Sequence, residues 1–280
     1  MNQIIPLMRR EWLQHRNGWL LLMGIPFGLL LLASTFGTIQ FNKVDDAPIS
    51  NSALPMVVTL VAILGVTVVN FLIVWITSLF IATGTSRRDQ GDRSIEFWLS
   101  LPTSHAASLT APLLVHLLLV PAAALVLGML GGTVVSAVLT TRLEGFGAWL
   151  SLPWVEIGLA SMATLARLLV GLPLATLWLL PLILLALLAE AWIGRWGVPV
   201  VGLALILGGV LLERLLGQPL LSQALHALWT HAATAMLPFD SVQFDGDNFY
   251  DAASRVASLS GWVWSRFGVS LRELASPLML

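Results

Sequence analysis

The stretch LLVGLPLATLWLLPLILLALLA, residues 168–189, decides the fold class of this chain. It contains no charged residue over 22 positions, and an α-helix of that length measures about 33 Å at about 1.5 Å per residue. The hydrocarbon core of a bilayer is about 30 Å thick. The stretch therefore predicts a helix that crosses a membrane.

Four further charge-free runs have the same character. They predict spans over Trp19 to Phe41, within Pro55 to Ala82, between Ala106 and Leu139, and over Gly197 to Leu212. The last run is short, but the charged residues beside it can extend to the lipid headgroups. A transmembrane barrel would show many segments of about ten residues with alternating polarity, and the sequence has none. We therefore predict an all-α fold, a polytopic transmembrane helical bundle with five spans, as a single domain over residues 1–280.

The composition agrees with this class and excludes others. The chain is 57% hydrophobic and 10% charged, with a mean hydropathy of +0.87, whereas soluble domains are about 25% charged. The net charge of −1 argues against a broad basic face, so we expect no nucleic-acid partner. Because the chain has no cysteine, disulfides, thiolate zinc sites and iron–sulfur clusters are excluded. The bilayer itself is the first expected partner.

Arginines near the first spans predict the orientation. The positive-inside rule gives most weight to short loops close to the first spans, although the totals on the two sides are equal. We expect a multi-pass protein of the plasma (inner) membrane with a cytoplasmic N-terminus. The arginines before the first span and in the loop after the second are Arg9, Arg10, Arg16, Arg87, Arg88 and Arg93.

The two ends of the chain differ from the spans. Residues 1–16 predict an amphipathic helix lying in the membrane interface; the alternative is a cytosolic extension of the first span. Its expected apolar face holds Met1, Ile4, Ile5, Met8 and Trp12. Residues 217–280 are expected as an outer-side tail, whose acidic residues lack the spacing of a calcium loop.

Proline and glycine recur inside the predicted spans. Paired prolines predict kinks, which suit a moving pathway but are also common in membrane helices generally. These pairs are Pro112 with Pro121 and Pro173 with Pro181. Gly128 and Gly132 have the spacing that permits close helix approach, a motif that also occurs often by chance.

No motif of an enzyme or a nucleotide-binding site is present. The sequence lacks G-x-x-x-x-G-K-[ST], H-E-x-x-H and G-x-S-x-G, so we expect no catalytic residue, cofactor or metal in this chain. His116 is the ionisable residue deep in the third predicted span and is a functional candidate by default. The alternative is a neutral histidine bonded to a neighbouring helix. No Asp, Glu or Lys lies near the centre of a predicted span, which argues against an ion-coupled carrier.

The most specific pattern lies between the second and third predicted spans. Residues 86–104 read SRRDQGDRSIEFWLSLPTS. A charge cluster with a glycine is followed by a short amphipathic stretch, which Pro102 ends. A cytosolic helix with exposed aromatics favours docking into a partner pocket; alternatively, Phe97 and Trp98 only anchor the loop at the interface.

This loop resembles that of the ABC-2 type (type V exporter) permeases. Residues 92–95 (DRSI), 97–98 (FW) and 100–104 (SLPTS) resemble their DRSIxFWxSLPxS pattern. In that family the loop joins transmembrane helices two and three and forms the coupling helix that docks on the ATPase. The match is specific over about a dozen residues, whereas Glu96 and Leu99 depart from it. Family members normally have six spans, so the resemblance implies either that a sixth helix is missing or that the five-span topology is wrong.

The resemblance implies a function. The chain would be the permease subunit of an ATP-driven export system, forming a homodimer or pairing with a sister permease. A separate ATPase subunit would bind ATP and Mg²⁺, so this chain would not itself be an enzyme. The alternative function is a non-transporting membrane scaffold or accessory protein. The docking residues would be Arg87, Arg88, Asp92, Arg93, Phe97 and Trp98.

Overall fold

The computed structural model describes residues 4–37, 54–84, 105–217, 219–237, 258, 260–265 and 267–273. Every regular element within these ranges is a helix, which confirms the all-helical class. The elements in chain order are α1 (Ile4–Phe36), α2 (Leu54–Thr83), α5 (His105–Leu114), the π-helix η1 (Val115–Leu119), α6 (Val120–Glu144), α7 (Phe146–Leu150), α8 (Trp154–Ile193), the 3₁₀-helix η2 (Gly194–Trp196), α9 (Gly197–Leu216), α10 (Leu220–Met236) and α12 (Phe267–Glu273).

Four of the described segments are long and apolar enough to cross a membrane. They are Ile4–Phe36, Leu54–Thr83, Ala106–Glu144 and Trp154–Leu215. The first three contain the first three predicted spans, apart from the end of the first beyond residue 37. The fourth takes in both the fourth and the fifth predicted spans. These segments indicate a multi-pass membrane protein, while the membrane and the orientation remain predictions.

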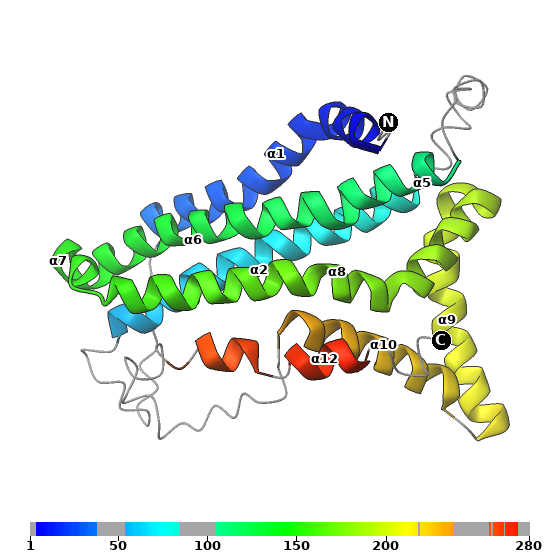
Figure 1. Ribbon diagram of the computed structural model, residues 1–280. Coiled ribbons are helices and arrows are strands. Elements are labelled where there is room, and N and C mark those ends of the chain that lie inside the picture. Colours follow the sequence, from blue (N-terminus) through cyan, green and yellow to red (C-terminus); the bar gives the residue numbers. More distant parts are fainter. Residues whose placement is uncertain are drawn as a thin grey trace.

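The helices are longer than the predicted spans. α8 has 40 residues, which at about 1.5 Å each gives about 60 Å, about twice the thickness of the hydrocarbon core. Residues 154–167, which the predicted span over residues 168–189 does not include, are the first part of α8. Likewise, residues 4–16 are the start of α1, which bends but continues unbroken to Phe36 (Figure 1). A helix in the interface over residues 1–16 therefore stays a prediction.

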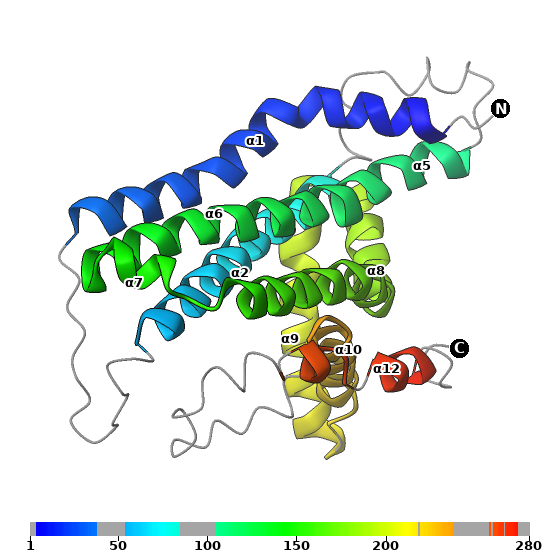
Figure 2. The same cartoon turned by 60° about the vertical axis from the view of Figure 1, so that its left-hand side comes forward.

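The core of the fold is a layer of long helices. α2, α6 and α8 run side by side, and α1 lies along α6 (Figures 1 and 2). α5 continues into α6 through η1, so the third apolar segment is one nearly straight rod (Figure 1). The start of α1, the end of α2 and the start of α5 lie at one end of this layer, and α7 lies at the other (Figure 1).

The closest contact joins α6 to α2 at the two predicted glycines. A Cβ on Gly128 would lie 2.8 Å from Thr67 Cα, and one on Gly132 would lie 2.7 Å from Ile63 Cα. The glycine pair therefore does permit close helix approach, as the spacing predicted. Hydrogen bonds reinforce it, because Asn70 Nδ2 donates to the Ala124 carbonyl at 2.9 Å. Membrane helices associate through this kind of packing and bonding, since lipid is as apolar as the helices themselves.

The last described helices leave the layer. Gly194, at φ +73°, ends α8, and α9 runs crosswise to α2, α6 and α8 in both views (Figures 1 and 2). The fifth predicted span is thus a helix, but it does not lie parallel to the others. α10 packs on α8 in a cluster that includes Trp178 and Ala235. α10 starts at the end of the layer where α1 starts (Figure 1), and the outer-side location of residues 217–280 stays a prediction.

Gly132→Ala is expected to destabilise the protein. The added methyl group forces α6 away from the α2 backbone, which costs about 1–3 kcal/mol for an overpacked site. The thermal unfolding midpoint in detergent, followed by helical circular dichroism, should fall. Gly65→Ala is the matched control on α2, because a Cβ at Gly65 meets nothing within 4 Å. An equal midpoint for both variants would show that the contact contributes nothing.

Candidate functional site

The third apolar segment changes its winding at a single π turn. Val120 N–H donates to the Val115 carbonyl, five residues earlier. Pro121 follows at the start of α6 and cannot donate to the carbonyl four residues before it, with which its ring would also clash. The wider π turn relieves that conflict, so the predicted proline distortion takes this form at Pro121. Such turns often mark functional sites, and this one contains His116.

His116 faces a polar cluster on α1. Glu11 and His15 lie four residues apart and therefore share one face of that helix. Glu11 Oε2 is 3.7 Å from His116 Nε2, and the nearest donor atoms of Glu11, His15 and His116 all lie within 4.8 Å of one another. His116 is 0% exposed and Glu11 is 2% exposed. The cluster is thus a buried juxtaposition of one carboxylate and two imidazoles; it is called the Glu11 cluster below.

The surroundings of the cluster fix its geometry. Arg10 Nη2 donates to Glu11 Oε1 at 3.0 Å, which leaves Oε2 turned toward His116. The ring centroids of His15 and Trp19 lie 5.5 and 5.7 Å from that of His116. Among the described residues, neither ring nitrogen of His116 has a hydrogen-bond partner. A buried polar group left without a partner costs about 1–3 kcal/mol, so this histidine is placed for a proton or a ligand.

Two kinds of chemistry fit the Glu11 cluster. A protonated His116 would form an ion pair with Glu11, and an imidazole–carboxylate pair can hold or pass on a proton. Alternatively, neutral imidazole and carboxylate are both good ligands for transition-metal cations. The expected alternative for His116, a hydrogen bond to a neighbouring helix, is not found among the described residues.

The sequence analysis identified His116 but missed Glu11 and His15. It placed Met8 and Trp12 on the apolar face of α1, and these residues do pack against the bundle. Glu11 lies between them in sequence and shares their buried face, although a lone acidic residue on such a helix is usually solvated. The sequence pattern that could have pointed to Glu11 and His15 is their Glu-x-x-x-His spacing, followed by Trp19 four residues later.

The predicted docking loop lies outside the described residues. This holds for Arg87, Arg88, Asp92, Arg93, Phe97 and Trp98, so their role in binding an ATPase stays a prediction. The described helices on either side are informative, since the end of α2 and the start of α5 lie together near the start of α1 (Figure 1). α5 has ten residues and is about 15 Å long, which sets the spacing between the loop and the π turn.

A second buried charge, Arg167 of α8, holds the end of α10. Its guanidinium donates to the carbonyls of Thr234 (3.0 Å), Ala235 and Val263 (3.3 Å). Thr234 and Ala235 belong to the last turn of α10, where carbonyls lack helical partners and the helix dipole favours a cation. The Phe267 ring lies 4.6 Å from the guanidinium carbon. Arg167 therefore lies inside the protein, fully buried.

Arg142 caps α1 in the same way. Its Nη1 donates to the Ser34 carbonyl at 2.8 Å and the Gly37 carbonyl at 3.0 Å. These carbonyls belong to the C-terminal end of α1, so the contact ties that end to α6. Both arginines thus bind the unpaired carbonyls at a helix end.

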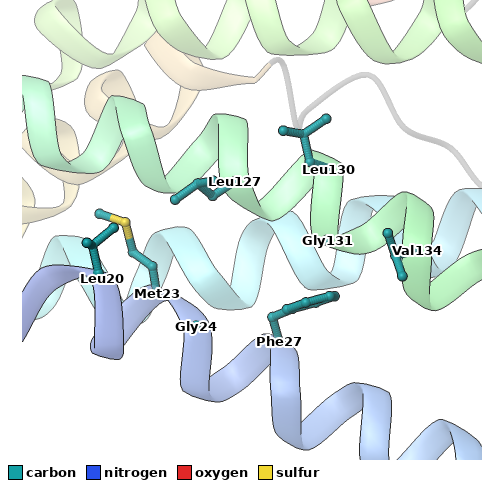
Figure 3. Close-up of a pocket in the computed structure, with 8 residues that line it drawn as sticks. All are labelled: Leu20, Met23, Gly24, Phe27, Leu127, Leu130, Gly131 and Val134. Carbon is teal, nitrogen blue, oxygen red and sulfur yellow. The ribbon is translucent and has the colours of Figure 1, made fainter.

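An apolar groove of about 280 Å³ lies between α1 and α6 (Figure 3). In Figure 3 Met23 and Phe27 extend from α1 toward α6. Its lining has no polar side chain, so the groove gives no indication of a substrate. The lining residues are Leu20, Met23, Gly24, Phe27, Leu127, Leu130, Gly131 and Val134.

Arg167→Met is expected to loosen α10. The variant keeps an unbranched apolar side chain but leaves three backbone carbonyls without their donor, at about 1–3 kcal/mol for each group left unpaired. Because the chain has no cysteine, Ala232→Cys supplies a single buried thiol on α10. Its maleimide labelling rate should rise at least tenfold, or about 1.4 kcal/mol, when Arg167→Met is added.

Arg214→Met is the control for that experiment, since Arg214 is an exposed residue in the last turn of α9. It should leave the labelling rate of the Ala232→Cys thiol unchanged. Equal rates with and without Arg167 would contradict its role in docking α10.

No protein-family model, no curated protein and no solved structure matches this chain. Its function is therefore inferred from its own residues and their arrangement.

Proposed function

We propose that this chain is the transmembrane permease subunit of an ATP-driven export system of the ABC-2 type. It dimerises, or pairs with a sister permease, and couples to a separate ATPase subunit that binds ATP and Mg²⁺. The observation that carries the proposal is the DRSIxFWxSLPxS pattern in residues 86–104. The pattern occurs between the second and third apolar segments, the same place as in the family it resembles.

The arrangement of the helices supports this function. α2 ends and α5 begins at one end of the helical layer, beside the start of α1 (Figure 1). A partner that binds the connection between α2 and α5 would therefore meet the first turns of α1 as well. With this end on the cytoplasmic side of the plasma membrane, as the arginine distribution predicts, an ATPase in the cytosol can reach both.

The surface of α1 supports a partner within the membrane. Only 17% of the apolar window of this helix is buried. Large apolar side chains such as Leu21, Leu29 and Phe36 are exposed, and they need lipid or a second permease around them. In the proposed dimer, part of this apolar surface of α1 would contact the partner subunit and the rest would contact lipid.

Coupling would pass through the third apolar segment. α5 leads from the loop to η1, and α6 beyond it is packed backbone to backbone on α2. A movement of the loop would shift α5 while the α2–α6 pair stays together. The π turn between α5 and α6, and the contact of α1 beside it, would then have to change. The apolar groove between α1 and α6 would widen or close with that movement.

A non-transporting membrane scaffold is the second candidate function. It is favoured by the direction of α9, which runs crosswise rather than parallel to the other apolar helices (Figures 1 and 2). A scaffold would use the same aromatic loop to assemble its partners. The two functions differ in whether one of these partners is an ATPase.

The pair Phe97→Ala/Trp98→Ala tests the proposal. The intact protein, purified in mild detergent from its native membranes, should bring down an ATP-binding subunit that mass spectrometry identifies. The double variant should recover at least tenfold less of it, because removing two aromatic anchors from an interface costs several kcal/mol.

Phe146→Ala/Trp149→Ala is the matched control, a phenylalanine and a tryptophan on α7 at the other end of the layer (Figure 1). This variant should recover the ATPase as well as the intact protein does. Recovery of other partners without any ATP-binding subunit would overturn the exporter and leave the scaffold.

A further inference from the structure

We propose that Glu11, His15 and His116 bind a divalent transition-metal cation of the zinc class. The inference goes beyond transport, because it concerns metal binding at a site between α1 and the π turn. It rests on the spacing of the donor atoms, the burial of His116 and the types of ligand present.

The spacing is close to that of a metal site. In a tetrahedral zinc site with bonds of about 2.0–2.1 Å, adjacent ligand atoms are about 3.3 Å apart. Glu11 Oε2 and His116 Nε2 are 3.7 Å apart, and all three donors lie within 4.8 Å of one another.

His116 provides the second, independent observation. It is fully buried, and among the described residues both of its ring nitrogens lack a hydrogen-bond partner. Its position in a π turn directs it at α1 rather than along its own helix. A metal ion bound to one nitrogen would compensate for the burial of that polar atom, which the surrounding Trp19 ring cannot do.

Arg10 binds Glu11 in the way that residues beside known metal sites bind the ligating carboxylate. Ligating carboxylates are usually held by a hydrogen bond to their second oxygen. Here Arg10 Nη2 donates to Glu11 Oε1 at 3.0 Å, and Oε2 is the oxygen that lies 3.7 Å from His116 Nε2. The positive charge of Arg10 also weakens the carboxylate as a ligand, which favours a site of moderate rather than extreme affinity.

The ligand set selects the class of ion. Two imidazoles and one carboxylate suit zinc and neighbouring first-row divalent metals, whereas calcium and magnesium require mostly oxygen ligands. Three protein ligands leave a fourth position for water or a further group. Because metal ligands must be deprotonated, zinc affinity should fall at acidic pH.

A bound ion would cross-link two elements that are far apart in the sequence and pack against each other in the fold. It would fasten the first turns of α1 to the third apolar segment, about 15 Å along α5 from the loop. The occupied site would thus hold the start of α1 against the third apolar segment. This consequence holds for an exporter and for a scaffold.

The test uses the full chain in detergent, purified without a polyhistidine tag and stripped with a chelator. Zinc titrated by equilibrium dialysis, with metal counted by mass spectrometry, should bind at one ion per chain. Cobalt(II) should give the visible absorption of a site with nitrogen ligands, and magnesium should not compete. Glu11→Gln and His116→Ala should each weaken zinc binding at least tenfold.

His226→Ala is the matched control, because His226 is exposed on α10 away from the cluster. It should leave both the stoichiometry and the affinity unchanged. If His116→Ala elutes as an aggregate, His15→Ala decides the test, since His15 is only half-buried. Zinc binding by the intact chain that is no tighter than by these variants, or no stoichiometric binding at all, would overturn the proposal.

Discussion

The contact of the α6 backbone with the α2 backbone is the constraint on which the rest of the bundle depends. In a membrane the apolar surfaces of helices gain little by meeting, because lipid solvates them equally well. Association must come from close packing and from hydrogen bonds. Gly128 and Gly132 provide the first, and Asn70 with its bond to the Ala124 carbonyl provides the second. The pair so formed offers one side to α1 and another to α8.

Buried or partly buried arginines bind the carbonyl groups at the ends of helices in this bundle. Arg142 binds carbonyls at the end of α1, and Arg167 binds carbonyls at the end of α10. A helix that ends inside a membrane protein leaves carbonyl groups that water cannot reach, and each would be costly unpaired. A guanidinium with five donors can satisfy several of them at once. The burial of Arg167 is therefore explained by what it binds, even though a lone arginine in an apolar sequence suggests a membrane boundary.

The features that could be predicted from sequence are local ones. An apolar run of about 20 residues specifies a helix regardless of its neighbours, and two glycines four apart lie on one helix face in any fold. The pairing of Glu11 with His116 depends on which helix packs on which, and nothing near either residue encodes that. The same is true of the direction of α9, which the turn at Gly194 sets. The docking role of residues 86–104 was inferred from their sequence alone and stays a prediction. The described structure adds that α2 ends and α5 begins at the same end of the helical layer (Figure 1).

The π turn at Val115–Leu119 has a mechanical consequence for the helix that contains it. One extra residue in a helical turn rotates everything on its N-terminal side by about 100° about the axis, relative to an uninterrupted α-helix. If the π turn moved along the helix by one turn, only the residues between its old and new positions would rotate. The two ends of the helix would keep their orientation relative to their neighbours. A wave of this kind could turn a few side chains from lipid to protein, or back, while every helix contact outside that short stretch stayed in register.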